Sequence, residues 1–415
     1  MKKSLVFILL LSCTSFSFGQ KTMSLPECES LFQKNNLLLL AEQFNIDASK
    51  AAVIQAKIWE HPVITTEINF YNPDDNRYFD TGKNGQKQLA IEQLIYLGGK
   101  KRNEINFAKN NVALAELQYE QLVRNLALQT RQNFYELYFE FQKFKSIETQ
   151  LNYLENLVAA YKSQTDKGNI ALKDLVRLQS LLLAFKNDML EINKQILEKR
   201  ENLKILTATS EDFLPTLNEQ ELKEKLNKPI LYLETKLQEI ALEKNPEYRF
   251  NLKLIENNEL YIKWQKSLAT PDITLGANYD QRGGAFNNQT NLTLAIPLPL
   301  WNKNKGNIKI AQAELQQNKI LKEQKELELK AKVTTAIQTY NFHQKKYKES
   351  ESSIHDFETV NQGILNNFQK KNISLIEFTD FMESYNQSTL YLNQIKKEVI
   401  LSGENLNYIT NDFIY

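Results

Sequence analysis

The chain carries the same short pattern twice. The first copy, from Gly168, reads GNIALKDLVRLQ, and the second, from Lys371, reads KNISLIEFTDFM, so that Asn169 matches Asn372 at a shift of 203 positions. Apolar residues then recur at alternating spacings of three and four, the heptad spacing of helices that pack as coiled coils. In the first copy this stripe consists of Leu175, Leu178, Leu182, Phe185, Met189, Ile192, Ile196, Leu203 and Leu206. The same stripe recurs in phase after the second copy, so we conclude that the chain is a duplicated unit.

Upstream of this pattern, the two halves match at a larger shift. Asn36 corresponds to Asn245, and Pro62 corresponds to Pro271, in both cases 209 positions later. The first half is therefore longer by six residues, and the excess lies in the polar loop at residues 72–87. Loops tolerate such insertions better than the elements that they connect.

The repeat predicts the domain organisation and the fold class. We expect a first repeat at residues 20–217, a linker at 218–232 and a second repeat at 233–415, each reading helix, strand, loop, strand, long helix, break, helix. Only 12 glycines and 9 prolines interrupt the 415 residues, which favours long helices and a mainly α fold with a small β part. The expected first helices are 26–60 and 233–268, the strands are 62–71, 88–96, 271–280 and 291–298, and the long helices are 99–160 and the stretch after 306.

The expected strands alternate between an apolar side and a polar side. In residues 62–71, Ile64 and Ile68 share one side, and Glu67 and Asn69 share the other. This alternation fits a sheet over a soluble core, and it equally fits a barrel strand between lipid and water. The long helices favour the second structure, because a soluble domain of this size has no use for rods several times longer than the usual three-turn helix.

The number of strands predicts an assembly of several chains. Two hairpins give four strands of about nine or ten residues, the length that crosses a bilayer when the strand is tilted. Four strands cannot close a barrel, and hydrocarbon does not tolerate an open sheet edge. The smallest usual membrane barrels have about eight strands, so several chains must share one barrel. A homotrimer would supply twelve strands.

These features together resemble the outer membrane efflux proteins of the TolC family. The resemblance rests on the duplication, on Asn245-Pro246 in the helical segment before a strand, on both copies of the repeated phrase, and on PLPLWNKNKGNIKIAQAEL after the last strand. It covers essentially the whole mature chain. The compact length and the segment PLPLWNKNKG are more similar to the heavy-metal branch of CzcC and CusC type than to TolC itself.

The resemblance implies an exit duct in the cell outer membrane. In that family a homotrimer forms a shared twelve-stranded barrel in the outer-membrane lipid, continued by an α-helical tunnel in the periplasm. Such a duct passively conducts substrates handed over by an inner-membrane pump, of RND type here, and by a periplasmic adaptor (membrane fusion) protein. Whether the cargo is a metal ion, a drug or another compound stays open, as do the particular pump and adaptor.

The alternative is a non-channel scaffold protein of the periplasm or the cell surface. It would use the coiled-coil helices and small hairpins without forming a pore. A scaffold would have no need of lipid-length strands with one aliphatic side, so the faces of the hairpins discriminate between the two functions.

The repeated phrase carries the candidate periplasmic gate. By the resemblance, Glu377 and Asp380 match acidic positions that line the constricted periplasmic end in the family, and Asp174 is the equivalent in the first half. Rings of carboxylates select cations and make closure sensitive to protonation. The alternative is that these acids simply favour the first turn of a helix, where the macrodipole stabilises negative charge. Beside them, Lys370 and Lys371 either pair with the acids or remain in solvent.

The first residues read as an export signal. A basic start, a short apolar run and small residues near position 20 predict a signal peptide at residues 1–19, cut after Gly19. Cys13 stands in a loosely lipoprotein-like context that the large Leu11 weakens, so lipidation of Cys13 stays open. No later stretch reaches 18 consecutive apolar residues, and we therefore expect no transmembrane helix.

The remaining composition argues against several other classes of function. The 51 basic and 50 acidic residues nearly balance, so we expect no nucleic-acid partner. His61, His343 and His355 are scattered and no phosphate-binding loop occurs, so we expect no enzymatic activity, no cofactor and no resident metal. Once the signal is removed, Cys28 is the only cysteine left and no internal disulfide can form.

Overall fold

The computed structural model describes residues 21–283 and 285–415, except for the side chains of Lys21, Phe286 and residues 352–359. The expected signal peptide, its cleavage after Gly19 and Cys13 lie outside the described residues. The described chain forms two compact units. The turn unit comprises the described residues up to Asn36, Gln129–Lys228 and Gln344–Leu401, and the sheet unit comprises Leu37–Leu128, Pro229–His343 and Ser402–Tyr415.

Helices make up most of the described chain, and strands make up a small part, so the predicted fold class is confirmed at that level. The strands are β1 (Lys21–Ser24), β2 (Val63–Ile68), β3 (Tyr71–Asn72), β4 (Arg77–Tyr78), β5 (Gln86–Ile95), β6 (Phe213–Thr216), β7 (Ile273–Arg282) and β8 (Phe286–Ala295). The helices are α1 (Leu25–Asn35), α2 (Leu37–Lys57), α3 (Lys100–Asp166), α4 (Leu172–Thr207), α5 (Glu219–Asn227), α6 (Glu234–Lys244), α7 (Pro246–Leu268), α8 (Lys305–Gln369) and α9 (Leu375–Thr410).

The duplication is visible in the lengths of the helices. The long helices α3 and α8 have 67 and 65 residues, and the helices that follow the two turns, α4 and α9, have 36 residues each. Most of the predicted heptad stripe of α4, from Leu175 to Leu206, is buried. The heptad pattern therefore identified the face on which α4 packs.

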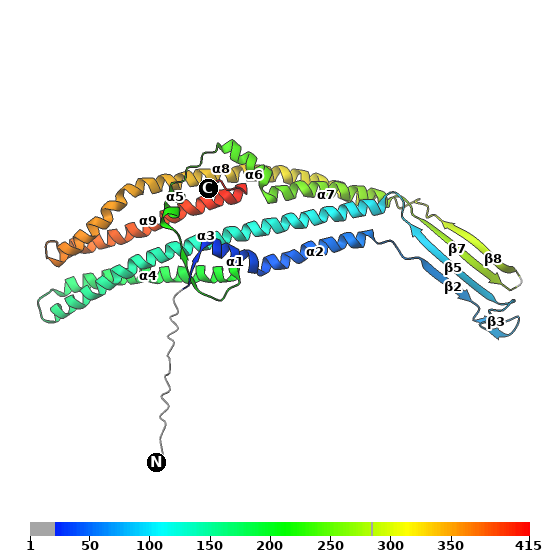
Figure 1. The fold of residues 1–415 in the computed structure, drawn as a ribbon, viewed down its shortest axis with the longest axis horizontal. Helices are drawn as coiled ribbons and strands as arrows, with labels where there is room; N and C mark the ends of the chain where they lie inside the picture. Colours follow the sequence, from blue (N-terminus) through cyan, green and yellow to red (C-terminus); the bar gives the residue numbers. More distant parts are fainter. Residues whose placement is uncertain (1–20, 284) are drawn as a thin grey trace, which may run out of the picture. The chain divides into compact units, whose positions relative to one another are not determined.

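The four predicted strands form one antiparallel sheet in the sheet unit (Figure 1). Their order is β2-β5-β7-β8, so the hairpin of each repeat is present and the two hairpins join through β5 and β7. The register runs straight across the sheet: Ile64 lies opposite Ile91, Ile91 opposite Ala277, and Ala277 opposite Leu292. Within residues 72–87, the loop that is longer in the first repeat, β4 completes a small hairpin with β3.

The chain passes from β5 into α3 through two glycines. Gly98 and Gly99 have φ angles of 66° and 72°, a backbone region that glycine enters without steric cost. A Cβ on Gly98 would lie 2.7 Å from the side chain of Thr270. Directly afterwards, Lys100 Nζ lies 2.6 Å from Asp272 Oδ2, with only 9% of the lysine and 18% of the aspartate side chain exposed. This ion pair ties the start of α3 to the start of β7.

The helix before the first strand of each repeat is broken, which corrects the single helices expected at 26–60 and 233–268. The break falls at Asn36, between α1 and α2, and at Asn245, between α6 and α7. Both asparagines have ψ of 119°, which is not helical. Pro246 explains the second break, because a proline disfavours the helical region for the residue before it.

A hydrophobic core of the sheet unit joins the second repeat's helices. It gathers buried residues of α6, α7, α8 and α9 together with one residue beyond α9, and its members are Leu237, Ala241, Tyr248, Leu329, Val333, Ala336, Leu406, Ile409 and Ile414. In the turn unit, the ring of Phe368 stacks on that of Phe378 with centroids 4.1 Å apart, close to the second turn.

Three elements of the turn unit were not predicted. β1 and β6 form a two-stranded parallel sheet, with Lys21 opposite Phe213. α5 lies inside residues 218–232, where the sequence analysis placed a linker. Its first turn is capped by Asn218, whose side-chain oxygen accepts a hydrogen bond from the Gln220 amide at 2.8 Å.

Candidate functional site

One face of the four-stranded sheet is apolar and exposed in the described chain. Directly opposed residues of an antiparallel sheet point to the same side, so the register defines each face. The exposed fractions of three side chains on this face are 68% for Ile64, 89% for Leu292 and 61% for Leu294. A contiguous exposed apolar surface marks a face that contacts something other than water. The apolar residues of this face are Ile64, Leu89, Ile91, Leu275, Ala277, Tyr279, Leu292 and Leu294, and the register places Thr66, Gln93 and Thr290 among them.

The opposite face of the same sheet is polar. One of its rows runs Glu67, Gln88, Asp280 and Gln289 across the four strands. A second row runs through Thr65, Ala90, Asn278 and Asn291. The sheet therefore has one mainly apolar face and one polar face, as the alternation in the sequence predicted.

Both outer edges of this sheet are unpaired among the described residues. β2 pairs only with β5, and β8 pairs only with β7. An open edge presents a row of backbone N–H and C=O groups that can pair with a strand of another chain. The sheet is thus an open strip whose two edges suit further strands.

Aromatic side chains gather at both ends of the sheet. At the end next to the helices, the rings of Trp59 and Tyr96 lie 5.8 Å apart, and the Tyr96 hydroxyl donates to Glu60 Oε1 at 3.0 Å. At the other end, the rings of Phe70 and Tyr78 also lie 5.8 Å apart, and about two thirds of each side chain is exposed. Tyrosine and tryptophan, with an apolar body and a polar tip, suit a boundary between apolar and aqueous surroundings.

The two turns that carry the repeated phrase share one geometry. Gly168 and its counterpart Lys371 adopt positive φ angles of 78° and 60°. The next residue, Asn169 or Asn372, donates its backbone amide to the carbonyl five positions earlier, at 2.9 Å in both turns. This is the Schellman ending of a helix. The asparagine side chain adds a second bond in both turns, because its amide donates to the side-chain oxygen of the same earlier residue, Gln164 at 2.8 Å or Asn367 at 3.2 Å. Lys371 adopts this ending although a Cβ at positive φ costs about 1–2 kcal/mol.

The structure places the three predicted gate acids at two helix starts of the turn unit. Asp174 lies half-buried in the first turn of α4, and Glu377 lies exposed in the first turn of α9. Asp380 is exposed one turn further along α9. Among the described residues, none of these carboxylates forms an ion pair, and neither do Lys370 and Lys371. Pairing of the lysines with the acids, one of the two expected arrangements, is therefore not found in the described chain.

Glu377 is held by the residue that begins its helix. The Ser374 amide donates to Glu377 Oε2 at 2.8 Å, and the Glu377 amide donates to Ser374 Oγ at 3.2 Å. This reciprocal arrangement is a capping box. Hydrogen bonds from the Ser374 amide and hydroxyl lower the pKa of Glu377. The helix-start role that the sequence analysis kept as an alternative is therefore present for Glu377.

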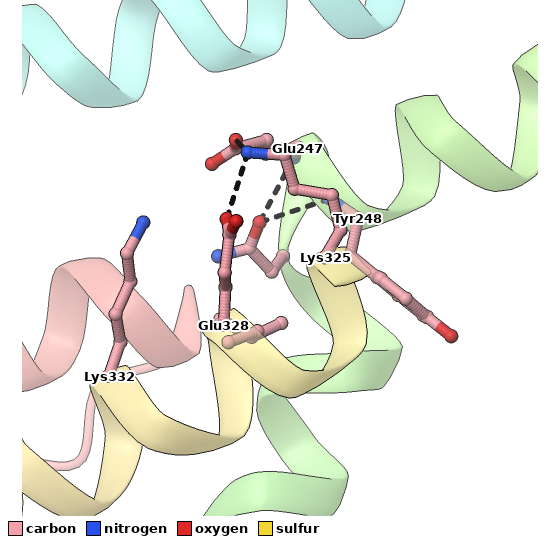
Figure 2. A pocket seen from close by; sticks show the side chains of 7 residues that line it. Glu247, Tyr248, Lys325, Glu328 and Lys332 are labelled. Atoms are coloured by element: carbon pink, nitrogen blue, oxygen red, sulfur yellow. Dashed lines mark hydrogen bonds and ion pairs between the residues drawn. The ribbon is translucent and has the colours of Figure 1, made fainter. Parts of the chain in front are cut away.

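A second charged cluster lies at the start of α7 in the sheet unit. Figure 2 shows Glu247 and Tyr248 of α7 beside Lys325 and Glu328 of α8. Lys325 Nζ lies 2.9 Å from Glu247 Oε1 and 3.1 Å from Glu328 Oε2. The Asn245 side-chain oxygen accepts hydrogen bonds from the Glu247 and Tyr248 amides at 3.0 and 3.3 Å. These two bonds show that the Asn245-Pro246 motif acts as a helix cap. The cavity between these residues measures about 10 Å³, which is room for one water molecule and too small for a ligand.

The sequence analysis missed a larger cavity in the turn unit. It measures about 490 Å³ and is lined by residues of α3, α4, β1 and β6. No local signal predicted it, because β1 and β6 have four residues each and pair across almost the whole first repeat.

Residues 21–283 and 285–415 contain no group of three or more His, Cys, Asp or Glu side chains placed to hold a metal ion. The side chain of His355 lies outside the described side chains. In the same part of the chain, no helix combines the length and the apolar character needed to cross a membrane.

Known proteins agree with this fold. Residues 30–209 match the family model described as outer membrane efflux protein. The chain is 21% identical over 311 residues to the cobalt-zinc-cadmium resistance protein CzcC of Cupriavidus metallidurans. The aligned region covers 72% of this chain and 69% of CzcC. The structure of CusC is 15% identical, with a TM-score of 0.74, and the match covers 93% of this chain and 91% of CusC. The outer membrane channel CmeC of Campylobacter jejuni is 13% identical, with a TM-score of 0.75 over 94% of this chain and 86% of CmeC.

The two structural matches span both repeats, and the curated relative is a heavy-metal resistance protein, in line with the branch that the sequence resembled. The family model covers most of the first repeat, and it describes channel-type efflux proteins rather than enzymes. Residues 30–209 thus match the outer membrane efflux protein family, and the chain as a whole shares the fold of the solved CusC and CmeC structures.

Proposed function

We propose that the chain is the outer-membrane exit duct of a tripartite efflux system. It passively conducts substrates that an RND-type inner-membrane pump and a periplasmic adaptor hand over. The observation that carries this proposal is the exposed apolar face of the sheet, on which Leu292 is 89% exposed. Such a face is unfavourable in water, whereas in hydrocarbon each aliphatic side chain is in a matching environment. The other face, with Glu67, Asp280 and Asn291, then lines an aqueous lumen.

The open edges of the sheet support a homotrimer. Hydrocarbon leaves no partner for unpaired backbone groups, so β2 of one copy must pair with β8 of the next. Three copies of the four-stranded sheet close a twelve-stranded barrel in the outer-membrane lipid. The long helices α3 and α8 then form an α-helical tunnel in the periplasm. Glu377, Asp380 and Asp174 form the candidate gate at its periplasmic mouth.

The cargo that we propose to test first is a divalent transition-metal ion. The similarity to CzcC, a cobalt-zinc-cadmium resistance protein, supports this choice. A cell that lacks the chain should become more sensitive to cobalt, zinc or cadmium if these ions are its cargo. Unchanged metal sensitivity together with increased drug sensitivity would redirect the search to organic substrates.

The decisive experiment compares two neighbouring residues of β8. Leu292→Lys places a charge on the proposed lipid face, and Asn291→Lys places the same charge on the polar face. A lysine on the lipid face of a membrane barrel costs about 2–4 kcal/mol at the midplane, whereas the lumen accepts polar groups. We expect Leu292→Lys to lower the amount of folded trimer in outer-membrane fractions, with Asn291→Lys close to the unmodified protein.

For a scaffold surrounded by water, the expectation is reversed. An exposed leucine in water is replaced by lysine at little cost, so both variants would accumulate equally. The protein would also wash off membranes with carbonate, without detergent. The mass of the protein in mild detergent is an independent test of the homotrimer. A monodisperse monomer that retains its strand content would contradict the shared barrel.

A further inference from the structure

A cavity in the turn unit combines unpaired cations with an apolar wall. It measures about 490 Å³ and lies between α3, α4 and the β1–β6 pair. Small-molecule sites in proteins are typically about 300–1,000 Å³ and mostly apolar, with a few polar groups that orient the ligand. The size of the cavity therefore suits a small organic molecule. All of its lining residues belong to the turn unit, and none of them is a residue of the four-stranded sheet or a gate acid.

Arg200 supplies the main polar group of this cavity. Its guanidinium lies over the ring of Phe141, 5.0 Å from the ring centroid. Its Nε is buried and has no hydrogen-bond partner. Among the described residues, Arg200 forms no ion pair, whereas the preceding Lys199 is 3.1 Å from both Glu136 and Glu198. An arginine offers five N–H donors in a planar fork that matches a carboxylate, and here the buried Nε–H is left without a partner.

The remaining lining adds positive charge and apolar contact. Lys145 is exposed at the cavity, and its side chain forms no ion pair among the described residues. No aspartate or glutamate lines the cavity. Phe141, Phe144 and Leu214 supply aromatic and aliphatic surface. The chemistry therefore calls for a ligand with one negative group and a compact apolar body.

We propose that this cavity binds a small aromatic monocarboxylate. Its carboxylate would accept hydrogen bonds from Arg200, with Lys145 adding electrostatic attraction, and its ring would lie against Phe141 and Phe144. A phosphate-only ligand would leave the apolar wall unused, and a neutral aromatic ligand would leave the guanidinium unpaired. The proposal is independent of the duct, since neither the sheet nor the gate contributes to this cavity.

The test uses the full mature protein in mild detergent and ligand-observed NMR titration. The probe is 3-phenylpropanoate, compared with the isosteric but neutral 3-phenylpropanamide and with acetate, which carries the charge without the ring. We expect saturable binding of 3-phenylpropanoate only. Equal binding of the amide would overturn the role of the cations, and equal binding of acetate would overturn the role of the apolar wall.

Matched variants assign the binding to Arg200. Arg200→Gln should weaken 3-phenylpropanoate by about tenfold or more, since hydrogen bonds to a charged group are the strong ones. Arg177→Gln is the control, because Arg177 is exposed on the same helix and does not line the cavity. Lys145→Gln, at an exposed position that tolerates substitution, should weaken binding less. The proposal fails if none of the probes binds the unmodified protein. It also fails if the Arg200→Gln and Arg177→Gln variants bind 3-phenylpropanoate equally well.

Discussion

The side-chain amide of Asn245 donates a hydrogen bond to the backbone carbonyl of Ile409 at 3.0 Å. In the first repeat, Asn36 makes the same bond to the carbonyl of Leu206 at 2.8 Å. Leu206 and Ile409 are each the last residue but one of their helices, α4 and α9. The duplication therefore extends to an individual tertiary contact. In both repeats, an asparagine at a helix break holds the end of the helix that follows the turn.

Replacing Asn245 by alanine tests the energetic weight of this contact. The change removes the bond to Ile409 and the two caps to the Glu247 and Tyr248 amides, and it leaves a buried carbonyl without its partner. We expect the free energy of unfolding to fall by about 1–3 kcal/mol, measured by denaturation followed by circular dichroism. Asn251→Ala is the control, because its amide bonds only to the Glu247 carbonyl of the same helix, at 2.8 Å. Equal losses in the two variants would contradict a special role for Asn245.

Gly403 should not tolerate a side chain. A Cβ there would lie 2.4 Å from the ring of Tyr415, which packs edge-on against Tyr340 with centroids 5.5 Å apart. Gly403→Ala should therefore displace Tyr415 and cost about 1–3 kcal/mol of unfolding free energy, the usual range for overpacking. In a Tyr415→Ala background the added methyl group should cost almost nothing. Additive losses in the double variant would show that the two residues do not interact.

Removing one partner of the buried ion pair between Lys100 and Asp272 should lower the free energy of unfolding more than replacing both partners. Asp272→Asn leaves Lys100 unpaired in a site where only 9% of its side chain is exposed, and we expect a loss of about 3–5 kcal/mol. Glu256→Gln, which breaks the more exposed 2.8 Å pair with Lys253, should cost well under about 1 kcal/mol. Replacing both buried partners, by Lys100→Met with Asp272→Leu, should recover much of the loss. A double variant as unstable as Asp272→Asn would contradict the charge argument.

The elements that follow local patterns could be predicted from the sequence. The heptad stripe from Leu175 to Leu206 predicted the packed face of α4, and period-two alternation predicted both faces of the sheet. The repeated asparagine predicted two equivalent turns, and the structure supplied the reason, since Asn169 and Asn372 close identical helix endings. Each of these signals is a periodicity or a repeat that can be read along the sequence, without knowledge of which distant residues are in contact.

The features that escaped prediction depend on residues far apart in the chain. The break at Asn36 has no proline beside it and is accompanied by a bond to Leu206, 170 positions away. The cavity around Arg200 exists only because β1 pairs with β6 beside α3 and α4. For Glu377, the sequence analysis gave the helix start as an alternative to the gate, and the hydrogen bonds with Ser374 show the helix-start role in atomic detail.

The pKa of Glu377 limits when protonation can affect the candidate gate. Hydrogen bonds from Ser374 lower it from the ordinary value of 4.5. A group whose pKa is depressed on folding stabilises the fold above its unfolded pKa, and this contribution is lost as pH falls through the folded pKa. Protonation of Glu377 should therefore alter the start of α9 only below about pH 4.5. We expect the conductance in planar bilayers to show no step near neutral pH that depends on Glu377. A step near neutral pH that is present in the unmodified protein and absent in Glu377→Gln would contradict a lowered pKa for Glu377.

The gate itself requires a variant that removes charge without removing the helix cap. Glu377→Gln preserves the capping box, because glutamine accepts the same amide bond, and Asp380→Asn removes the second carboxylate. In planar bilayers the double variant should lose preference for cations and become less sensitive to block by divalent cations, since multivalent ions gain most from clustered carboxylates. Glu239→Gln with Asp47→Asn is the control: both residues lie in the sheet unit, and 68% of each side chain is exposed. Correctly assembled trimers of the first variant with unchanged selectivity and block would leave Glu377 as a helix cap alone, and the gate would have to be sought among other residues of the turn unit.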